Sequence, residues 1–313
     1  MSVGSAPLGS RRTSTGVEIT VVPDDVPDEV SEFSTPRAVP SPPTGLSNKG
    51  AQPPGAGVRS LLRSVALPSE HGGWGLTAEP VLLGLIVAPS LAGLAIGVAA
   101  IASFLARTPL KLVLVDTWRH RDLPRTRLAA KVAAVEITLI GALLITASLL
   151  ADLRFWIPLL IAGPLFGVEL WFDMRSRGRR LAPELAGSVG IGSVGAAVIL
   201  AGGGSATAAA AAWVVIAARA IASLPFVRYQ LKRRKDLPRS WWEQDVAGAA
   251  GLGLAVLASV VDVLPWVATA AVAALVATQS VLARTRVSTA VVVGVQQMFF
   301  GIAVTVVAGL VIS

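Results

Sequence analysis

The sequence predicts an all-α integral membrane protein, a bundle of about nine transmembrane helices with its N-terminus inside and its C-terminus outside. Of the 313 residues, 53% are hydrophobic and only 15% are charged, and the mean hydropathy is +0.68. A soluble domain has about 25% charged residues and cannot hide so much apolar surface from water. The positions of the basic residues supply the orientation, as described below.

Composition also excludes several classes of function. The chain has no cysteine, so disulfides, thiolate metal sites and a cysteine nucleophile are excluded. The formal net charge of +8 would suit a nucleic-acid partner. In a membrane chain, however, basic residues mark the side that stays in the cytoplasm, and we therefore expect no nucleic acid.

Two regions follow from the distribution of apolar residues. Residues 1–58 are rich in Pro, Ser and Gly and contain no apolar stretch long enough for a core or a signal peptide. Such a segment buries too little surface to offset the entropy of ordering, which predicts a disordered cytoplasmic tail. Residues 59–313 are predicted to form a polytopic helical membrane domain.

Each crossing of the hydrocarbon core needs about 20 mainly apolar residues. Residues 74–106 could alternatively form one long helix, because Pro89 would be tolerated in a membrane helix. The nine predicted spans are 71–88, 90–115, 128–150, 154–172, 183–201, 205–227, 245–263, 265–283 and 288–312.

Charge decides between the two span counts and sets the orientation. With nine spans, the loops on the side opposite the N-terminal tail contribute one basic residue, Arg154. Nearly all the other basic residues then lie on the tail side, as the positive-inside rule requires of a cytoplasmic surface. Merging the first two spans would place Arg59 and Arg63 outside. We therefore expect a multi-pass protein of the plasma membrane.

Several ionisable or amide side chains fall inside the apolar spans. Ionisable groups in hydrocarbon cost about 3 kcal/mol or more each and usually mark a cavity or a buried pair. Counted from the nearest loops, five of these side chains lie about 12–14 Å from the cytoplasmic side. They form either a polar pocket open to the cytoplasm or ion pairs that hold helices together. With the loop residue Arg228, the candidate substrate-binding residues are Glu79, Arg107, Glu136, Arg219, Arg228 and Gln296.

The predicted cytoplasmic loops carry further candidates. If the second span continues as a helix, Asp116 and His120 lie four residues apart on one face and could share a proton or a metal ion. Asp116 and Asp122 are the weak candidates for a metal site, and Asp245 lies in the loop after span 6. The alternative for the loop after span 2 is a solvated, salt-bridged loop. The alternative for the loop after span 6 is a contact with anionic lipids that also sets the topology.

A glycine-rich motif, PSEHGGWG at residues 68–75, precedes the first span. Its glycines cost about 1 kcal/mol each in a helix relative to Ala, so they suggest close packing or approach of the backbone to an anionic ligand. His71 titrates near neutral pH and is a candidate acid, base or ligand, or simply an interfacial side chain. The chain contains no Walker loop, no HExxH and no GxSxG motif.

The stretch LPSEHGGWGLTAEPVLLGL, followed by SFLARTPLKLVL, resembles the opening of the YwiC-like membrane proteins. That resemblance implies a bacterial multi-pass membrane protein and no particular reaction. A more distant similarity is to the UbiA-type intramembrane prenyltransferases, carried by the nine spans, the polar loops after spans 2 and 6, and RGRRLAPELAGSVGIGSVGAAV. In that family aspartate-rich motifs hold Mg²⁺ against an isoprenyl diphosphate. Asp116 matches the first motif only in part, and Asp236, Glu243 and Asp245 do not match the second.

The leading functional hypothesis is a degenerate UbiA-like enzyme or binder that acts on a lipid with an anionic, diphosphate-type head group. In this hypothesis Arg107, Arg219 and the loop arginines bind the head group in a cavity that faces the cytoplasm. His71, Asp116, His120 and Asp245 are the candidate catalytic residues, and Mg²⁺ is a possible cofactor. The alternative is a transporter or a non-catalytic membrane subunit whose charged pairs fasten helices. Beyond membrane lipids, the sequence indicates no protein partner.

Overall fold

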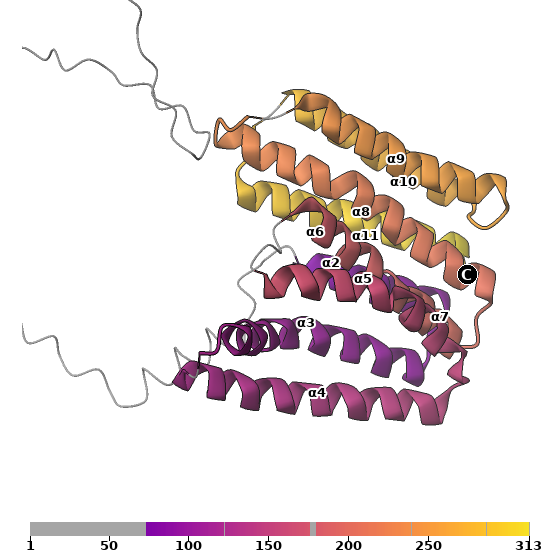
Figure 1. Ribbon diagram of the computed structural model, residues 1–313. Coiled ribbons are helices and arrows are strands. Elements are labelled where there is room, and N and C mark those ends of the chain that lie inside the picture. Colours follow the sequence, from indigo (N-terminus) through magenta and orange to yellow (C-terminus); the bar gives the residue numbers. More distant parts are fainter. Residues whose placement is uncertain (1–72, 122, 176–179, 239, 286, 313) are drawn as a thin grey trace, which may run out of the picture. The chain divides into compact units, whose positions relative to one another are not determined.

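The computed structural model describes residues 73–121, 123–175, 180–238, 240–285 and 287–312 (Figure 1). All of them belong to one compact unit, Gln52–Ser313. The predicted tail, 1–58, and two of the candidate residues, His71 and Asp122, lie outside the described residues.

All the regular secondary structure among the described residues is helical, with no strand. The short helix η1 continues directly into α5, and α6 continues into α7 through a break at Gly192, so the elements make nine helical passes. The elements are α2 (Gly73–Val87), α3 (Leu91–Trp118), α4 (Pro124–Leu150), η1 (Leu153–Phe155), α5 (Trp156–Met174), α6 (Leu181–Ile191), α7 (Ser193–Ala201), α8 (Ala206–Arg234), α9 (Trp241–Val260), α10 (Trp266–Thr285) and α11 (Ala290–Ile312).

Seven of the nine passes are long and apolar enough to cross a membrane. The two outside this set are α2 and α9. The 15 residues of α2 rise about 22 Å, which is less than the roughly 30 Å of the hydrocarbon core. The first turns of α9 contain Glu243, Gln244 and Asp245. The prediction of about nine helices is therefore confirmed in number, and seven of them qualify as full-length spans.

The predicted boundary between the first two spans is confirmed. Helix α2 ends at Val87, and α3 begins at Leu91 after an N-cap at Ser90. The Ser90 hydroxyl accepts a hydrogen bond from the backbone N–H of Gly93 at 2.9 Å, which satisfies one of the free donors of the first turn. The alternative of one long helix over 74–106 is wrong.

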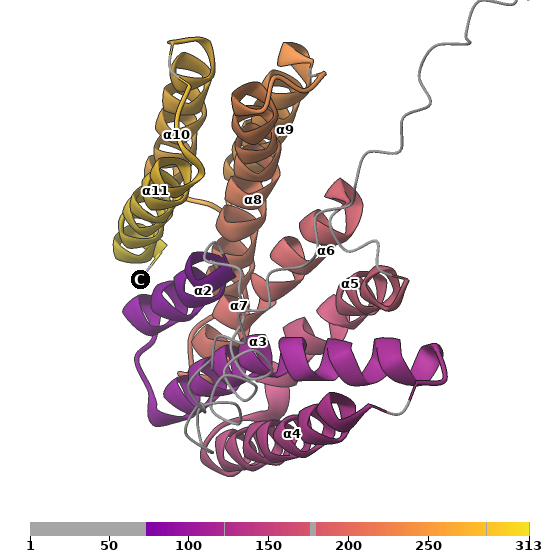
Figure 2. The same cartoon turned by 90° about the vertical axis from the view of Figure 1, so that its left-hand side faces the viewer.

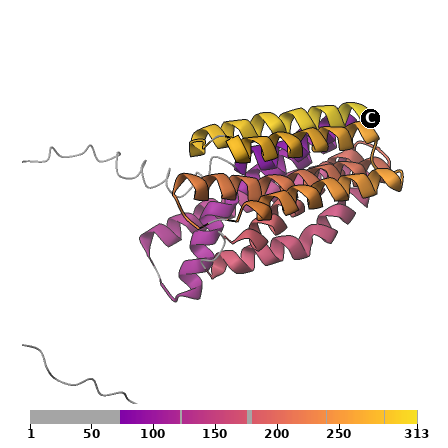
Figure 3. The ribbon, with the colours of Figure 1, turned by 90° about the horizontal axis from the view of Figure 1, so that it is seen from above.

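The passes run side by side, and successive ones alternate in direction (Figure 1). We call the end where α3, α5, α8 and α10 finish the basic end, and the other the opposite end. Figure 2 faces the basic end and places α8–α11 on one side and α3–α5 on the other. Figure 3 shows α10 and α11 side by side along their length. Basic residues at the basic end include Arg119, Arg121, Arg125, Arg127, Arg175, Arg180, Lys232, Arg233, Arg234, Lys235 and Arg284.

The opposite end carries little charge. Among the described residues its one basic residue is Arg154, in η1, whose Nε lies 3.0 Å from Oδ2 of Asp152. The backbone N–H of Arg154, and then its side chain, donate to this carboxylate and hold the pKa of Asp152 below its usual value. The two charges therefore cancel, and the asymmetry between the ends agrees with the loop assignment made from sequence.

Two apolar clusters form the core. One lies among α2, α7, α8, α9, α10 and α11, and the other lies among α2, α3, α4, α5 and α7. Alanines dominate both, and they allow the helix backbones to approach closely. One close approach is between α8 and α9, where a Cβ on Gly251 would meet the carbonyl oxygen of Ala218.

Candidate functional site

A buried ion pair joins α2 to α8. Nη2 of Arg219 lies 2.9 Å from Oε1 of Glu79, and both side chains are almost fully buried, at 3% and 2% exposed. The same Nη2 donates to the backbone carbonyl of Gln297 on α11 at 2.9 Å. Helix α11 leaves room for the pair at Gly301, where a Cβ would fall on Oε1 of Glu79 and on Nη2 of Arg219. Three helices therefore meet at one charged contact inside the bundle.

Amide and hydroxyl groups extend this contact to α10. Nε2 of Gln279 donates to Oγ of Ser223, one turn along α8 from Arg219, at 2.9 Å. It also lies 3.1 Å from Oε1 of Gln297. We call Glu79, Arg219, Ser223, Gln279 and Gln297 the deep polar cluster. All five are buried, so the hydrogen bonds among them partly offset the cost of removing them from water.

A second charged group lies between α3 and α5. Oδ2 of Asp173 accepts from Nε and Nη2 of Arg107 at 3.2 and 3.1 Å, and Oδ1 lies 2.8 Å from Nζ of Lys111. Nη2 of Arg107 also lies 2.8 Å from Oε1 of Glu169. We call these four residues the α3–α5 ion-pair cluster. Asp173 is 4% exposed, whereas the side chains of Arg107 and Lys111 are 38% and 41% exposed.

Asp116 and His120 do not share a helical face, so that prediction is wrong. Helix α3 ends at Trp118, and the backbone of His120 turns to φ +52°. Asp116 is buried and instead accepts a 2.6 Å hydrogen bond from the hydroxyl of Thr126, with Nη2 of Arg125 at 3.6 Å. The carboxylate therefore fastens the end of α3 to the start of α4.

The remaining loop candidates also lie in pairs. Oδ2 of Asp245 contacts Nη2 of Arg284 at 2.5 Å, which joins α9 to α10. Nη1 of Arg228 contacts Oε2 of Glu184 at 2.6 Å, which joins α8 to α6. Asp116 and Asp245, the two acidic residues expected near a common cavity, thus belong to separate contacts.

Two candidates from the apolar spans take no part in these pairs. Glu136 is partly buried on α4, and its Oε2 has no hydrogen-bond partner among the described residues. Gln296 is also partly buried, and its neighbour Gln297 supplies the amide of the deep polar cluster. The structure thus brings together Glu79 and Arg219, and it places Arg107, Arg228 and Glu136 elsewhere.

In the described ranges, no three His, Asp or Glu side chains lie close enough together to hold a metal ion. Two acidic residues on α5, Glu169 and Asp173, already face Arg107 and Lys111. A carboxylate pair that is balanced by two cations is a poor magnesium ligand, because the metal would have to displace both.

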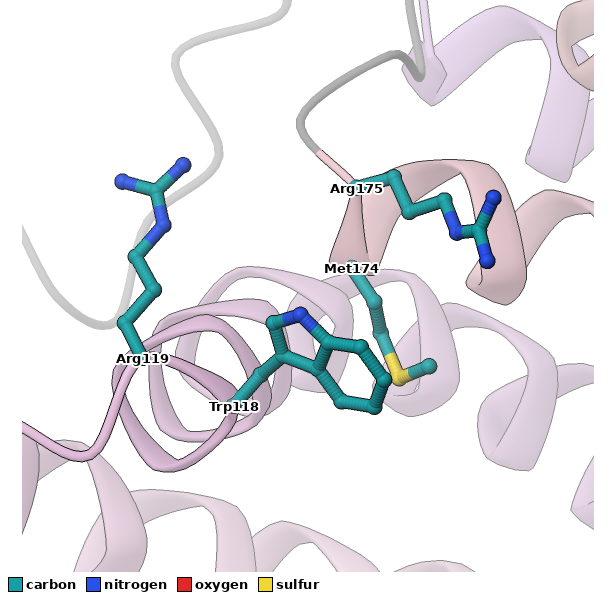
Figure 4. Close-up of a pocket in the computed structure, with 4 residues that line it drawn as sticks. All are labelled: Trp118, Arg119, Met174 and Arg175. Carbon is teal, nitrogen blue, oxygen red and sulfur yellow. The ribbon is translucent and has the colours of Figure 1, made fainter.

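A pocket of about 400 Å³ opens at the basic end, between the ends of α3 and α5. It is lined by Trp118 and Arg119 from α3 and by Met174 and Arg175 from α5. In Figure 4 the indole of Trp118 and the thioether of Met174 point toward one another, while the two guanidinium groups project to either side. The guanidinium of Arg175 lies 4.1 Å above the ring of Trp171, which orients it.

Sequence reasoning missed several residues of these sites. Asp173 follows Glu169 by one helical turn, a spacing that could have indicated a second acid on the same face. Each wall of the pocket is an apolar residue followed by arginine, Trp118–Arg119 and Met174–Arg175, at the end of a span. This pattern is typical of a membrane interface but does not by itself indicate a pocket.

The comparisons with known proteins support one of the two resemblances. The model of the YwiC-like protein family matches residues 67–199, from before α2 to near the end of α7. No curated protein and no solved structure matches the chain. The protein is therefore a multi-pass helical membrane protein whose residues 67–199 match the model of the YwiC-like protein family.

Proposed function

We propose that the protein binds a lipid with an anionic head group in the pocket between α3 and α5, with the basic end facing the cytoplasm. The observation that carries this proposal is the lining of the pocket, which contains two arginines and no carboxylate. Arginine presents a planar set of donors that matches the oxygens of a phosphate, and it is more weakly hydrated than lysine. A phosphate at this position would lie between two cationic side chains.

The apolar lining suits the rest of a lipid. Trp118 and Met174 offer an indole face and a flexible thioether at the level where head groups meet acyl chains. A free phosphate ion would use only the arginines. A lipid would use both kinds of side chain, which favours a lipid head group over a soluble anion.

The α3–α5 ion-pair cluster holds the walls of the pocket in place. Asp173 directly precedes Met174, and it is fixed to α3 by its contacts with Arg107 and Lys111. Since these contacts tie α5 to α3 about two to three turns before Trp118, Arg107 positions the pocket instead of contacting the ligand. This differs from the direct head-group contact that the sequence suggested for it.

The positive-inside rule supports the orientation in this proposal. Basic residues concentrate at the end that holds the pocket, and the opposite end has one arginine in a pair with Asp152. Anionic lipids of the cytoplasmic leaflet attract such a surface by about 1 kcal/mol per basic residue near it. A binder is favoured over a UbiA-like enzyme because Asp116 and Asp245 lie in separate structural contacts.

A second candidate function is that of a non-catalytic membrane subunit. It is favoured by the arrangement of the ion pairs, since Glu79–Arg219 joins α2 to α8, Arg107–Asp173 joins α3 to α5, and Asp245–Arg284 joins α9 to α10. Pairs of this kind fix helices against one another without requiring a substrate. The two candidates are compatible, because a fastened bundle can also bind lipid.

The test is lipid binding to purified protein, measured by native mass spectrometry with phosphatidylglycerol, phosphatidylcholine and farnesyl diphosphate. We expect phosphatidylglycerol to bind in preference to phosphatidylcholine. Replacing both pocket arginines, Arg119→Gln and Arg175→Gln, should weaken that binding about tenfold or more, because each charge-assisted contact contributes about 1.5–3 kcal/mol before solvent screening. If farnesyl diphosphate binds and its binding depends on Mg²⁺, the ligand is a diphosphate lipid and not a phospholipid.

The matched control removes two charges from the same end outside the pocket, as Lys232→Gln and Arg234→Gln on α8. This control should retain most of the affinity if the pocket, and not the general surface charge, binds the lipid. Equal losses in the two double variants, or no preference for the anionic lipid in the wild type, would contradict the proposal.

A further inference from the structure

The deep polar cluster contains more hydrogen-bonding groups than it can satisfy. Oε2 of Glu79, Nε of Arg219 and Nε2 of Gln297 are buried and have no hydrogen-bond partner among the described residues. Leaving such a group unpaired is destabilising, and more so when the group is charged. Buried polar groups in native proteins are therefore nearly always paired with protein or with ordered water.

These unpaired groups lie around one location. Nη2 of Arg219 is 2.9 Å from Oε1 of Glu79 and 2.9 Å from the backbone oxygen of Gln297, so the Glu79 carboxylate and the backbone of Gln297 meet at the same guanidinium. Gly301 lies directly opposite, and the space that a Cβ would fill there is taken by the ends of Glu79 and Arg219. One bound species at this location could therefore reach more than one of the unpaired atoms.

A further unpaired hydroxyl extends the location along α11. Thr305 lies one turn after Gly301 and two turns after Gln297 on the same face. Its Oγ1 is fully buried without a partner among the described residues. Other helical threonines of this chain bond back to the carbonyl four residues earlier, as Thr138 does at 2.8 Å and Thr278 at 2.7 Å. The hydroxyl of Thr305 is thus available to a different partner.

We propose that the deep polar cluster is an internal hydration site, in which bound water bridges Glu79, Arg219 and Gln297. The unpaired atoms include an acceptor on Glu79 and donors on Arg219 and Gln297, so the ligand must both donate and accept. An anion would be repelled by the Glu79 carboxylate, and a cation would be repelled by Arg219. Water is neutral, small and able to make two to four hydrogen bonds, which matches this set of groups.

The natural absence of cysteine gives a direct test, because one introduced thiol becomes the only thiol in the chain. The test variant is Ser223→Cys, at the buried hydroxyl that Gln279 contacts. The matched control is Val272→Cys, at a fully buried position of the apolar core on α10, two turns from Gln279. Both changes are close in volume. Size-exclusion profiles and circular dichroism would confirm that the variants fold.

X-ray radiolysis of the purified protein in lipid nanodiscs converts water into hydroxyl radicals where that water resides. The radicals oxidise nearby thiols, and mass spectrometry measures the rate. We expect the thiol of Ser223→Cys to oxidise several times faster than that of Val272→Cys.

Thr305→Cys provides a second reporter with the same expected result, and it carries the comparison if Ser223→Cys does not fold. Oxidation of both reporters at the rate of Val272→Cys would overturn the proposal. The proposed lipid pocket is not involved in this result, since it lies at the basic end and shares no residue with the cluster.

Discussion

Replacing Gly301 with alanine should break the contact that joins α2, α8 and α11. The added Cβ would overlap Oε1 of Glu79 and Nη2 of Arg219. Both atoms are ends of flexible side chains, so each could rotate away. Because they flank the same point, relief of the overlap separates the ion pair at 2.9 Å.

Two effects set the loss of stability expected for Gly301→Ala. Overpacking a buried site costs about 1–3 kcal/mol, and separating one partner of a buried ion pair costs about 3–5 kcal/mol. Rotation of the two side chains relieves the overpacking but partly separates the ion pair. We therefore expect Gly301→Ala to lower the free energy of unfolding by about 3 kcal/mol.

The assay is equilibrium unfolding of the purified protein in mixed micelles with increasing dodecyl sulfate, followed by near-ultraviolet circular dichroism. Gly294→Ala, on the same helix, is the matched control because a Cβ there meets no atom within 4 Å. We expect this control to unfold within about 0.5 kcal/mol of the wild type. Equal stability of the two alanine variants would refute the reasoning that Gly301 accommodates the pair.

Three further substitutions test other contacts by the same unfolding assay. Gly251→Ala should destabilise by about 1–3 kcal/mol, because its Cβ meets the rigid backbone carbonyl of Ala218, whereas Gly253→Ala meets nothing and should be neutral. Equal effects would contradict the close approach of α8 and α9. Ser90→Ala should cost about 1 kcal/mol through loss of the N-cap of α3, and no loss would show that the cap is dispensable. Asp173→Asn should cost about 1–2 kcal/mol, reduced by the exposure of its basic partners, and should also weaken lipid binding at the pocket. Unchanged lipid binding by Asp173→Asn would show that the α3–α5 ion-pair cluster does not position the pocket.

The positions of the helices could be predicted from sequence because hydropathy along one segment is a local property. All nine predicted spans correspond to helical passes, and Pro89–Ser90 separates the first two. The structure extends α3 to Trp118, starts α4 at Pro124 and ends α8 at Arg234. These extensions were not predicted, because charged residues continue a helix beyond the hydrocarbon without an apolar signal.

The partners of the charged residues could be predicted only in part. The sequence indicated that ionisable groups inside the spans could form ion pairs between helices, and the structure pairs Glu79 with Arg219. The sequence alone could not determine which residues pair. Pairing depends on the rotation of each helix about its axis and on which helices are neighbours. Asp173 illustrates this limit, because its position at the end of an apolar span resembles that of any interfacial acid.

The pocket could not be predicted for a similar reason. Its four lining residues come from two helix ends that are about 55 residues apart in the chain, and only the packing of α5 against α3 brings them together. From sequence, candidate site residues were predicted in the loops after spans 2 and 6. The structure instead places Asp116 and Arg228 in contacts that fasten neighbouring helices.

Measuring the orientation of the bundle tests the proposed function most directly, because the proposed pocket must face the cytoplasmic leaflet. Thr207→Cys and Lys235→Cys place single thiols at exposed positions near the two ends of α8. In intact cells that express each variant, a membrane-impermeant maleimide should label Thr207→Cys, and it should label Lys235→Cys only after lysis. Labelling of Lys235→Cys in intact cells, with Thr207→Cys protected, would place the basic end outside and contradict the account.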